Sequence, residues 1–325
     1  MTSEFSDTSG TELVVVSAAD TASLVAEMRR LVAFLDRVPD VSFLDVAYTA
    51  SLTTGPARIA MIADGVPSLR ARLASAVSRL ESGTMRRLKD KSGTYYFRDH
   101  LLCEGGGKLA FVYPGVMSFY PDMMRDLAVL HPECRGAFDE LEEAMAGIDD
   151  AFTPSNFIFP PAPYYRHDAD VFSSGAYAQA LVATFAGSAA MSRLLEDCAI
   201  APDAVVGCAG GDLASVMRSG AAGEHPPRQD RVRFIREIYR IVDKAVDHEG
   251  LPKTAMISIL MRHEGDADAV VASFPKGKAM LAMDLSPRQR TYAVQPDFAD
   301  EALRAFAGAG VRAVRNALDR PFNTP

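Results

Sequence analysis

The sequence predicts an α/β protein: a parallel-sheet core, a small α/β unit before it and a ferredoxin-like subdomain inserted in it. Two observations lead to this prediction. Short apolar stretches typical of buried strands, such as residues 108–113, alternate with longer stretches that have the period of amphipathic helices. In residues 251–316 the order changes to strand, helix, strand, strand, helix, strand. That βαββαβ order is typical of the ferredoxin-like fold.

The composition is that of an ordinary globular protein and argues against several function classes. The 325 residues are 48% hydrophobic and 23% charged, which allows a large core and two domains. The net charge of −8 argues against nucleic-acid and anionic membrane partners, which need basic surfaces. No apolar run reaches the ~20 residues of a membrane span, and the polar, acidic first residues do not resemble a signal peptide. We therefore expect a cytoplasmic protein.

Cysteine and histidine spacing indicates no metal site, disulfide framework or cofactor. The four cysteines, Cys103, Cys134, Cys198 and Cys208, contain no C-x-x-C pair. The histidines also lack metal-ligand spacing and are expected at the surface: His100, His131, His167, His225, His248 and His263. The acidic residues around His248 (Asp243, Asp247 and Glu249) are interpreted as a solvated helix end.

Residues 1–11 are expected to be a disordered lead and residues 12–104 a small α/β unit. Asp20 is a favourable cap for the first helix. The predicted strands are residues 12–17 and 57–63, and the predicted helices are residues 21–35, a second beginning at 41–48, and 66–80. The unit ends in a basic, polar run at residues 85–91.

Residues 105–250 and 317–325 are expected to form the larger core, which begins with a glycine hinge at residues 105–107. Its predicted strands are residues 108–113 and 204–207; its helices are residues 121–129, 132–145, 175–195, 231–246 and one ending near Gly220; residues 151–167 are an irregular loop. Alternating strands and helices with buried strands favour a parallel sheet.

Residues 205–212, Val-Val-Gly-Cys-Ala-Gly-Gly-Asp, have the frame of a nucleophile elbow, G-x-S-x-G between a strand and a helix. Ala209 stands where the serine would be, and alanine has no reactive oxygen. The elbow residue usually has positive φ, which is a strained conformation. Neighbouring glycines relieve crowding around such a turn, and the residues that keep this scaffold are Gly207, Gly210, Gly211 and Asp212.

Three segments, in the same order, resemble the acyltransferase domains of polyketide synthases and related fatty-acid synthases. Residues 109–121 are similar to the opening F-P-G-Q-G-S-Q-Y-x-x-M motif, residues 202–221 to the segment around G-H-S-x-G-E, and residues 318–325 to a late V-S-H-A-F-H-S-P segment. Residues 12–104 resemble the adaptor that follows a ketosynthase. The loop at residues 158–161 resembles synthases of the polyunsaturated-fatty-acid type.

The resemblance implies a hydrolase-like fold that moves an acyl group from coenzyme A to an acyl carrier protein. A serine attacks the thioester, a histidine acts as base, backbone N–H groups hold the oxyanion, and an arginine binds the malonyl carboxylate. The serine falls on Ala209, the histidine before it on Cys208, the oxyanion glutamine on Val116, the base on Asn323 and the arginine on Ile238. Five changes in one mechanism predict a catalytically silent protein that serves as a scaffold for a ketosynthase or an acyl carrier protein.

Two alternatives stay open: an acyltransferase, thioester hydrolase or decarboxylase that uses other residues of the same cleft, and a decayed gene product. Cys208 is a candidate nucleophile because a helix N-terminus lowers a thiol pKa. It stands one residue from the elbow tip without its usual base, so we expect a small, buried apolar side chain instead. Ser118 is expected to be structural. The sequence does not identify the pathway, the product or the partner.

Overall fold

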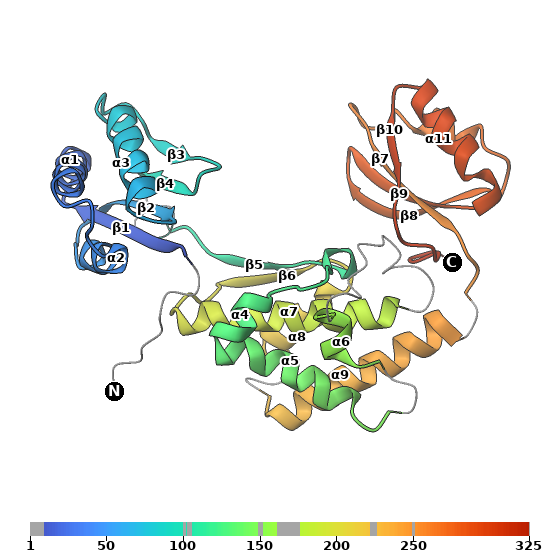
Figure 1. Ribbon diagram of the computed structural model, residues 1–325. Helices are drawn as coiled ribbons and strands as arrows, with labels where there is room; N and C mark the ends of the chain where they lie inside the picture. The colour runs from blue at the N-terminus through green and yellow to red at the C-terminus, as the bar shows by residue number, and fades with distance from the viewer. Residues whose placement is uncertain are drawn as a thin grey trace. The chain divides into compact units, whose positions relative to one another are not determined.

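The computed structural model of the chain (Figure 1) describes residues 10–99, 102, 106–148, 152–160, 176–221, 226–248 and 251–324. The chain divides into two compact units, Met1–Lys108 and Leu109–Pro325. Several positions considered above lie outside the described residues: His100, Cys103, Gly105, residues 161–167, His225, Glu249 and Pro325.

The first unit is a four-stranded sheet with the order β1-β2-β4-β3 and antiparallel pairing throughout. Its elements are β1 (Glu12–Ala18), α1 (Thr21–Arg37), α2 (Phe43–Ser51), β2 (Ala57–Ala63), α3 (Val66–Leu80), β3 (Arg87–Lys89) and β4 (Thr94–Phe97). The Asp20 carboxylate caps α1 by accepting a hydrogen bond from the Ser23 backbone N–H at 2.7 Å. Leu24, Met28 and Leu73 pack with the strand residues Ile59 and Met61 in one core.

The polar run that we expected to close this unit forms a hairpin instead. Asp90 Oδ1 accepts hydrogen bonds from the backbone N–H groups of Ser92 (3.0 Å) and Thr94 (3.1 Å), and Gly93 has a φ of +89°. A carboxylate that closes its own turn and a glycine with positive φ are sufficient to reverse the chain. The charged residues of β3 are tolerated because that strand lies at the edge of the sheet.

The second unit begins with a helical layer around two parallel strands. Its elements are β5 (Ala110–Tyr113), η1 (Val116–Ser118), α4 (Arg125–Leu130), α5 (Pro132–Met145), α6 (Pro154–Ile158), α7 (Tyr177–Asp197), β6 (Ala204–Gly207), α8 (Gly211–Arg218), α9 (Arg228–Val242) and the π-helical turn η3 (Asp243–His248). Helix α4 starts later than predicted because Asp122 and Met124 have positive φ (60° and 58°). Helix α6 lies within the stretch that was predicted to be irregular.

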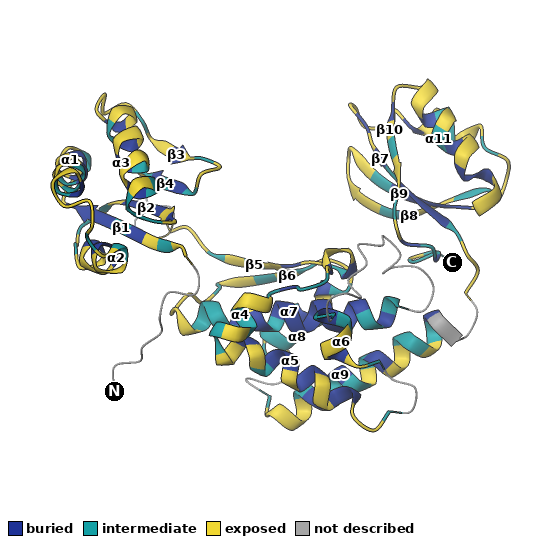
Figure 2. Cartoon of the chain, viewed as in Figure 1, coloured by how far each residue is buried: buried dark blue, intermediate teal, exposed yellow. Residues whose placement is uncertain are grey.

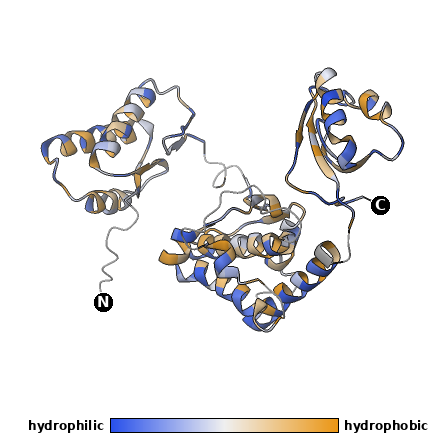
Figure 3. Ribbon diagram, turned by 45° about the vertical axis from the view of Figure 1, so that its right-hand side comes forward, coloured by the Kyte–Doolittle hydropathy of each residue, from blue (hydrophilic) through white to orange (hydrophobic). Residues whose placement is uncertain are grey.

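Helix α7 is the centre of this layer. Small residues let the neighbouring helices approach closely, and α5, α8 and α9 all contact it. Its middle is buried on nearly every side (Figure 2), whereas α9 alternates charged and apolar residues along its length (Figure 3). No helix among the described residues is long and apolar enough to cross a membrane.

Strands β5 and β6 pair in parallel, with Val112 opposite Val206. Tyr113 is buried and its hydroxyl is 2.9 Å from the hydroxyl of Ser192 in α7, so one face of the pair lies on the helices. The other face is bare: Val112 is 70% exposed and Val206 is 52% exposed. Our expectation of a buried strand at residues 108–113 is therefore wrong, because helices cover only one face.

The βαββαβ segment forms an antiparallel sheet of order β10-β7-β9-β8, as expected for a ferredoxin-like subdomain. Its elements are β7 (Ala255–Leu260), α10 (Asp268–Ala272), β8 (Ala279–Ser286), β9 (Gln289–Val294), η4 (Pro296–Phe298), α11 (Ala299–Gly308) and β10 (Arg312–Arg315). After β10 the chain returns to the helical layer, where Phe322 stacks on Tyr177 with ring centroids 4.5 Å apart.

Candidate functional site

The elbow lies between the carboxyl end of β6 and the amino end of α8. The Cys208 N–H donates to the Tyr113 carbonyl of β5 at 3.0 Å, and the Asp212 N–H donates to the Ala209 carbonyl at 3.0 Å. Ala209 has a φ of +50°, a left-handed conformation that costs an L-residue roughly 1–2 kcal/mol. The strained turn predicted from the sequence is present.

The glycines of the elbow are sterically required. A Cβ on Gly207 would lie 2.4 Å from the Asp212 backbone nitrogen, and one on Gly211 would lie 2.2 Å from the Tyr113 carbonyl oxygen. Both neighbours are backbone atoms, which cannot swing aside. A Cβ on Gly210 would meet the end of the Leu181 side chain at 2.3 Å, a group that can move more easily. Gly207 and Gly211 therefore allow β5, β6 and α8 to pack closely.

The segment after β5 lies against the elbow. A Cβ on Gly115 would be 3.0 Å from the Cys208 carbonyl oxygen and 3.4 Å from the Ala209 Cβ. Val116 follows and is buried. The structure thus brings the positions of Val116 and Ala209 together. Val116 keeps its backbone N–H, so the change from glutamine removes no main-chain donor there.

Cys208 is exposed, contrary to our expectation of a buried side chain. It follows Val206 at a spacing of two residues, and side chains alternate between the two faces of a strand. Cys208 follows the end of β6 directly and, like Val206, is exposed.

The other two predicted positions lie on different elements. Ile238 is half-buried on α9 and packs against the core of the helical layer. Asn323 is exposed in a turn with a φ of +58°, directly after the Phe322 ring that stacks on Tyr177.

Comparison with known sequences relates the chain to polyketide synthases. It is 28% identical over 211 residues to polyketide synthase GfsA of Streptomyces halstedii, and 22% identical over 312 residues to the highly reducing polyketide synthase aurA of Calcarisporium arbuscula. These alignments cover 64% and 95% of this chain but 2% and 12% of the relatives, so the chain spans a small part of their length. No family model matches the chain.

Solved structures decide the fold. The acyltransferase domain of ZmaA matches 97% of this chain and 66% of its own, with a TM-score of 0.70 and 16% identity. The acyltransferase domain from module 8 of the salinomycin polyketide synthase matches 96% of this chain and 67% of its own, with a TM-score of 0.67 and 19% identity. The chain has the fold of a polyketide synthase acyltransferase domain.

Another similar structure was solved together with a partner protein. It is a malonyl-transacylase solved in complex with its type II polyketide synthase acyl carrier protein, similar over 66% of this chain and 64% of its own, with a TM-score of 0.51 and 20% identity. At such identities these structures establish the fold of this acyltransferase-like domain and nothing finer.

The chemistry available at the elbow of this acyltransferase-like domain is narrow. Ala209 presents a methyl group, and Asp212, in the first turn of α8, favours that helix by its charge. No group of three or more histidine, cysteine, aspartate or glutamate residues that could hold a metal ion occurs in the described part of the chain. The exposed thiol of Cys208 is the reactive group nearest to Ala209 in the sequence.

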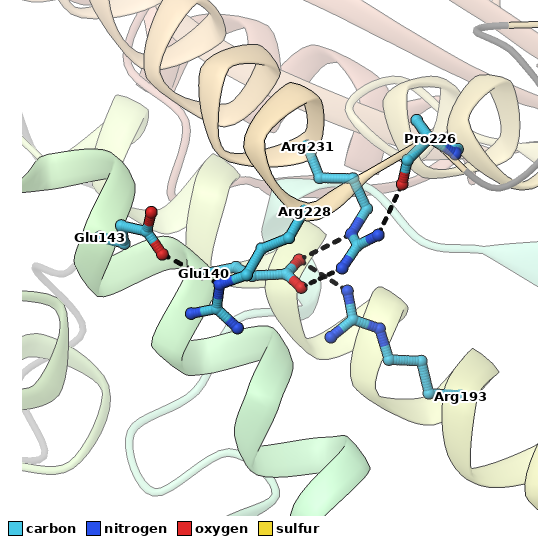
Figure 4. Close-up of polar contacts among 6 residues, drawn as sticks. All are labelled: Glu140, Glu143, Arg193, Pro226, Arg228 and Arg231. Atoms are coloured by element: carbon cyan, nitrogen blue, oxygen red, sulfur yellow. Dashed lines mark hydrogen bonds and ion pairs between the residues drawn. The ribbon is translucent and has the colours of Figure 1, made fainter.

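Sequence reasoning missed a polar centre that side chains of α5, α7 and α9 form around Glu140 (Figure 4). Glu140 of α5 has a side chain only 4% exposed, and its Oε2 accepts from Arg193 Nη2 of α7 at 2.6 Å and from Arg231 Nε of α9 at 3.0 Å. Arg231 Nη2 also donates to Glu140 Oε1. Burial raises the pKa of Glu140, but the two arginines outweigh burial and hold that pKa below its ordinary value.

Proposed function

We propose that this acyltransferase-like domain is catalytically silent and acts as a scaffold in a polyketide or fatty-acid synthase, toward a ketosynthase or an acyl carrier protein. The observation that carries this proposal is the elbow: Ala209 keeps the φ of +50° that presents a nucleophile, yet offers only a methyl group. Because Gly207 and Gly211 are fixed by packing, the turn has an architectural reason to persist without chemistry.

The residues at the other predicted positions also support a catalytically silent domain. Asn323 has an amide that cannot take up a proton near neutral pH, so it cannot act as the base. Ile238 has no charge with which to bind a malonyl carboxylate. In subtilisin, loss of the serine or the histidine alone lowers turnover about 10⁶-fold, and here both positions are changed.

Incubation with radiolabelled malonyl-CoA and acetyl-CoA tests this silence. We expect no covalent acyl-protein adduct and no transfer to a holo acyl carrier protein, under conditions in which a serine-containing acyltransferase domain is labelled. Formation of an adduct, or transfer to the carrier protein, would contradict the proposal.

The exposure of Cys208 favours one alternative, an acyltransferase or thioester hydrolase that uses this thiol. Its thiolate would attack the thioester carbon, and the coenzyme A thiolate would leave. This alternative predicts a labelled protein whose adduct is released by hydroxylamine and absent from Cys208→Ala. A stable adduct in Cys208→Ala would point to another residue.

The scaffold role is supported by an apolar stripe on the adaptor unit. Leu44, Tyr48 and Leu52 recur every four residues along α2 and its end, and all three are exposed, Tyr48 by 66%. A helix places residues four apart on one side, so the three form a single strip. Exposed apolar strips rimmed by polar residues are typical of protein interfaces.

Binding to a ketosynthase of a polyketide synthase tests the strip. We expect Leu44→Asp with Tyr48→Asp to weaken that binding about tenfold or more, since apolar anchors dominate interfaces. Val38→Asp, at another exposed apolar position of the same unit, is the control and should leave binding unchanged. If both variants weakened ketosynthase binding equally, or if neither weakened it, the strip would not be the docking surface.

A further inference from the structure

A cavity of about 470 Å³ lies along α8, which lines it with Ala214, Met217 and Arg218. Its lining also includes Tyr113, whose carbonyl accepts a hydrogen bond from the Cys208 N–H of the elbow. The lining includes none of the positions that the acyltransferase resemblance assigned.

The lining contains a group of apolar side chains, called here the apolar wall, and a group of charged side chains, called here the charged wall. The apolar wall comes mainly from α7, α8 and α9: Phe185, Ala189, Met217 and Ile235. The charged wall contains Arg193, Arg218 and Arg231 with Glu140 and Glu196. Pockets of a few hundred cubic ångströms with an apolar lining and a few polar groups are typical small-molecule sites.

The charged wall carries one positive charge more than it can neutralise. Arg218 pairs with Glu196, which leaves Arg193 and Arg231 to share the single carboxylate of Glu140. Arg231 is well supplied: its Nε and Nη2 donate to Glu140, and its Nη1 donates to the Pro226 carbonyl at 2.6 Å. Arg193 has fewer hydrogen-bond acceptors: a guanidinium has five N–H donors, and the described hydrogen bond of Arg193 uses Nη2 alone.

The excess charge is held where water screens it weakly. The side chains of Arg193 and Arg231 are only 24% and 30% exposed, and Glu140 between them is almost fully buried. An anion that reached Arg193 would balance the charge and use its free donors. A guanidinium fork matches the geometry of a carboxylate.

We propose that this cavity binds a monoanionic amphiphile, a carboxylate with a short or medium-length aliphatic tail. The carboxylate pairs with Arg193, and the tail lies along Phe185, Ala189 and Met217. A single negative charge matches the single excess positive charge. None of the elbow residues 207–212 lines this cavity, and its occupation does not depend on whether the elbow is silent.

Calorimetric titration of the full chain with sodium octanoate tests the site, with 1-octanol as a probe that has the same tail and no charge. We expect octanoate to bind one to one, and 1-octanol to bind about tenfold more weakly or worse, because the charge-assisted hydrogen bonds are lost. Equal binding of the two probes would overturn the assignment of a carboxylate.

Two variants test whether the carboxylate binds at Arg193. Arg193→Met keeps the length of the side chain and leaves the Glu140–Arg231 pair neutral, so it should weaken octanoate binding about tenfold. Arg228→Met is the matched control: it removes an arginine that pairs with Glu143 outside the cavity lining, and it should bind as the natural chain does.

A second variant decides the question if Arg193→Met does not fold. Ala189→Phe fills the cavity from α7 and leaves every charge in place, so it should abolish binding with helix content retained. Absence of binding to the natural chain, or unchanged binding in Ala189→Phe, would overturn the proposal and leave the arginines a purely structural role.

Discussion

Gly211→Ala tests whether the elbow is kept by packing. A Cβ at this position would lie 2.2 Å from the Tyr113 carbonyl oxygen and 2.8 Å from the Pro114 carbonyl oxygen. A carbon–oxygen contact normally begins at about 3.3 Å, so β5 and α8 would have to separate by about 1 Å. That movement strains the core and stretches the hydrogen bond from the Cys208 N–H to Tyr113.

The magnitude follows from three opposing effects. Overpacking costs about 1–3 kcal/mol, and loss of one hydrogen bond costs about 1 kcal/mol. Alanine regains about 0.4–1 kcal/mol, because it restricts the unfolded chain more than glycine does and Gly211 does not have positive φ. We expect the free energy of unfolding to fall by about 1–3 kcal/mol.

Urea unfolding followed by circular dichroism measures the loss, and hydrogen exchange at the β5 and β6 amides assigns it to this unit of a two-unit chain. Gly308→Ala is the control, because a Cβ on this helical glycine meets nothing within 4 Å. We expect that variant to be neutral or slightly more stable. If Gly211→Ala were as stable as Gly308→Ala, the packing explanation of the elbow would be refuted.

Three further outcomes are expected. The lowered pKa of Glu140 contributes stability that is complete above the ordinary pKa of 4.5 and is lost as the pH falls through the folded-state pKa. Glu140→Gln should therefore lower the free energy of unfolding by about 3 kcal/mol at pH 7 and flatten the dependence of the urea midpoint on pH below 5. An unchanged dependence on pH would contradict this prediction. The double variant Ala209→Ser with Asn323→His should not restore malonyl transfer in a carrier-protein labelling assay, and recovered transfer would show that Ile238 is not the carboxylate-binding position. Peptide mapping after brief alkylation of the folded protein should find Cys208 modified and the buried Cys134 protected, whereas equal labelling would contradict the exposures.

The fold could be predicted where local signals agree. The helix at residues 132–145 was placed correctly because Pro132 fixes its first turn and its buried residues recur with helical spacing. The β3–β4 hairpin was missed because β3 is a charged strand of only three residues, so the aromatic residues of β4 were left without an evident partner strand in the sequence. The start of α4 was misplaced because Asp122 and Met124 have positive φ, which neither residue type requires.

The polar centre around Glu140 could not be predicted from the sequence for a related reason. Glu140 lies between Ala137 and Ala144 on the buried face of α5, so the sequence does signal a carboxylate that needs partners. Its partners Arg193 and Arg231 are 53 and 91 residues away. No periodicity connects positions so far apart, and only the packing of α5, α7 and α9 brings them together.

We expect the bare face of the β5–β6 pair to affect how the protein behaves at high concentration. Carbonyls of Leu109 and Tyr113 point toward β6, so the backbone groups of Ala110 and Val112 point the other way, where no described strand receives them. An unpaired strand edge beside exposed valines is a template for strands of other molecules. Self-association should therefore rise with concentration, and a lysine at Val112 should suppress it by placing a charge where two such edges would meet.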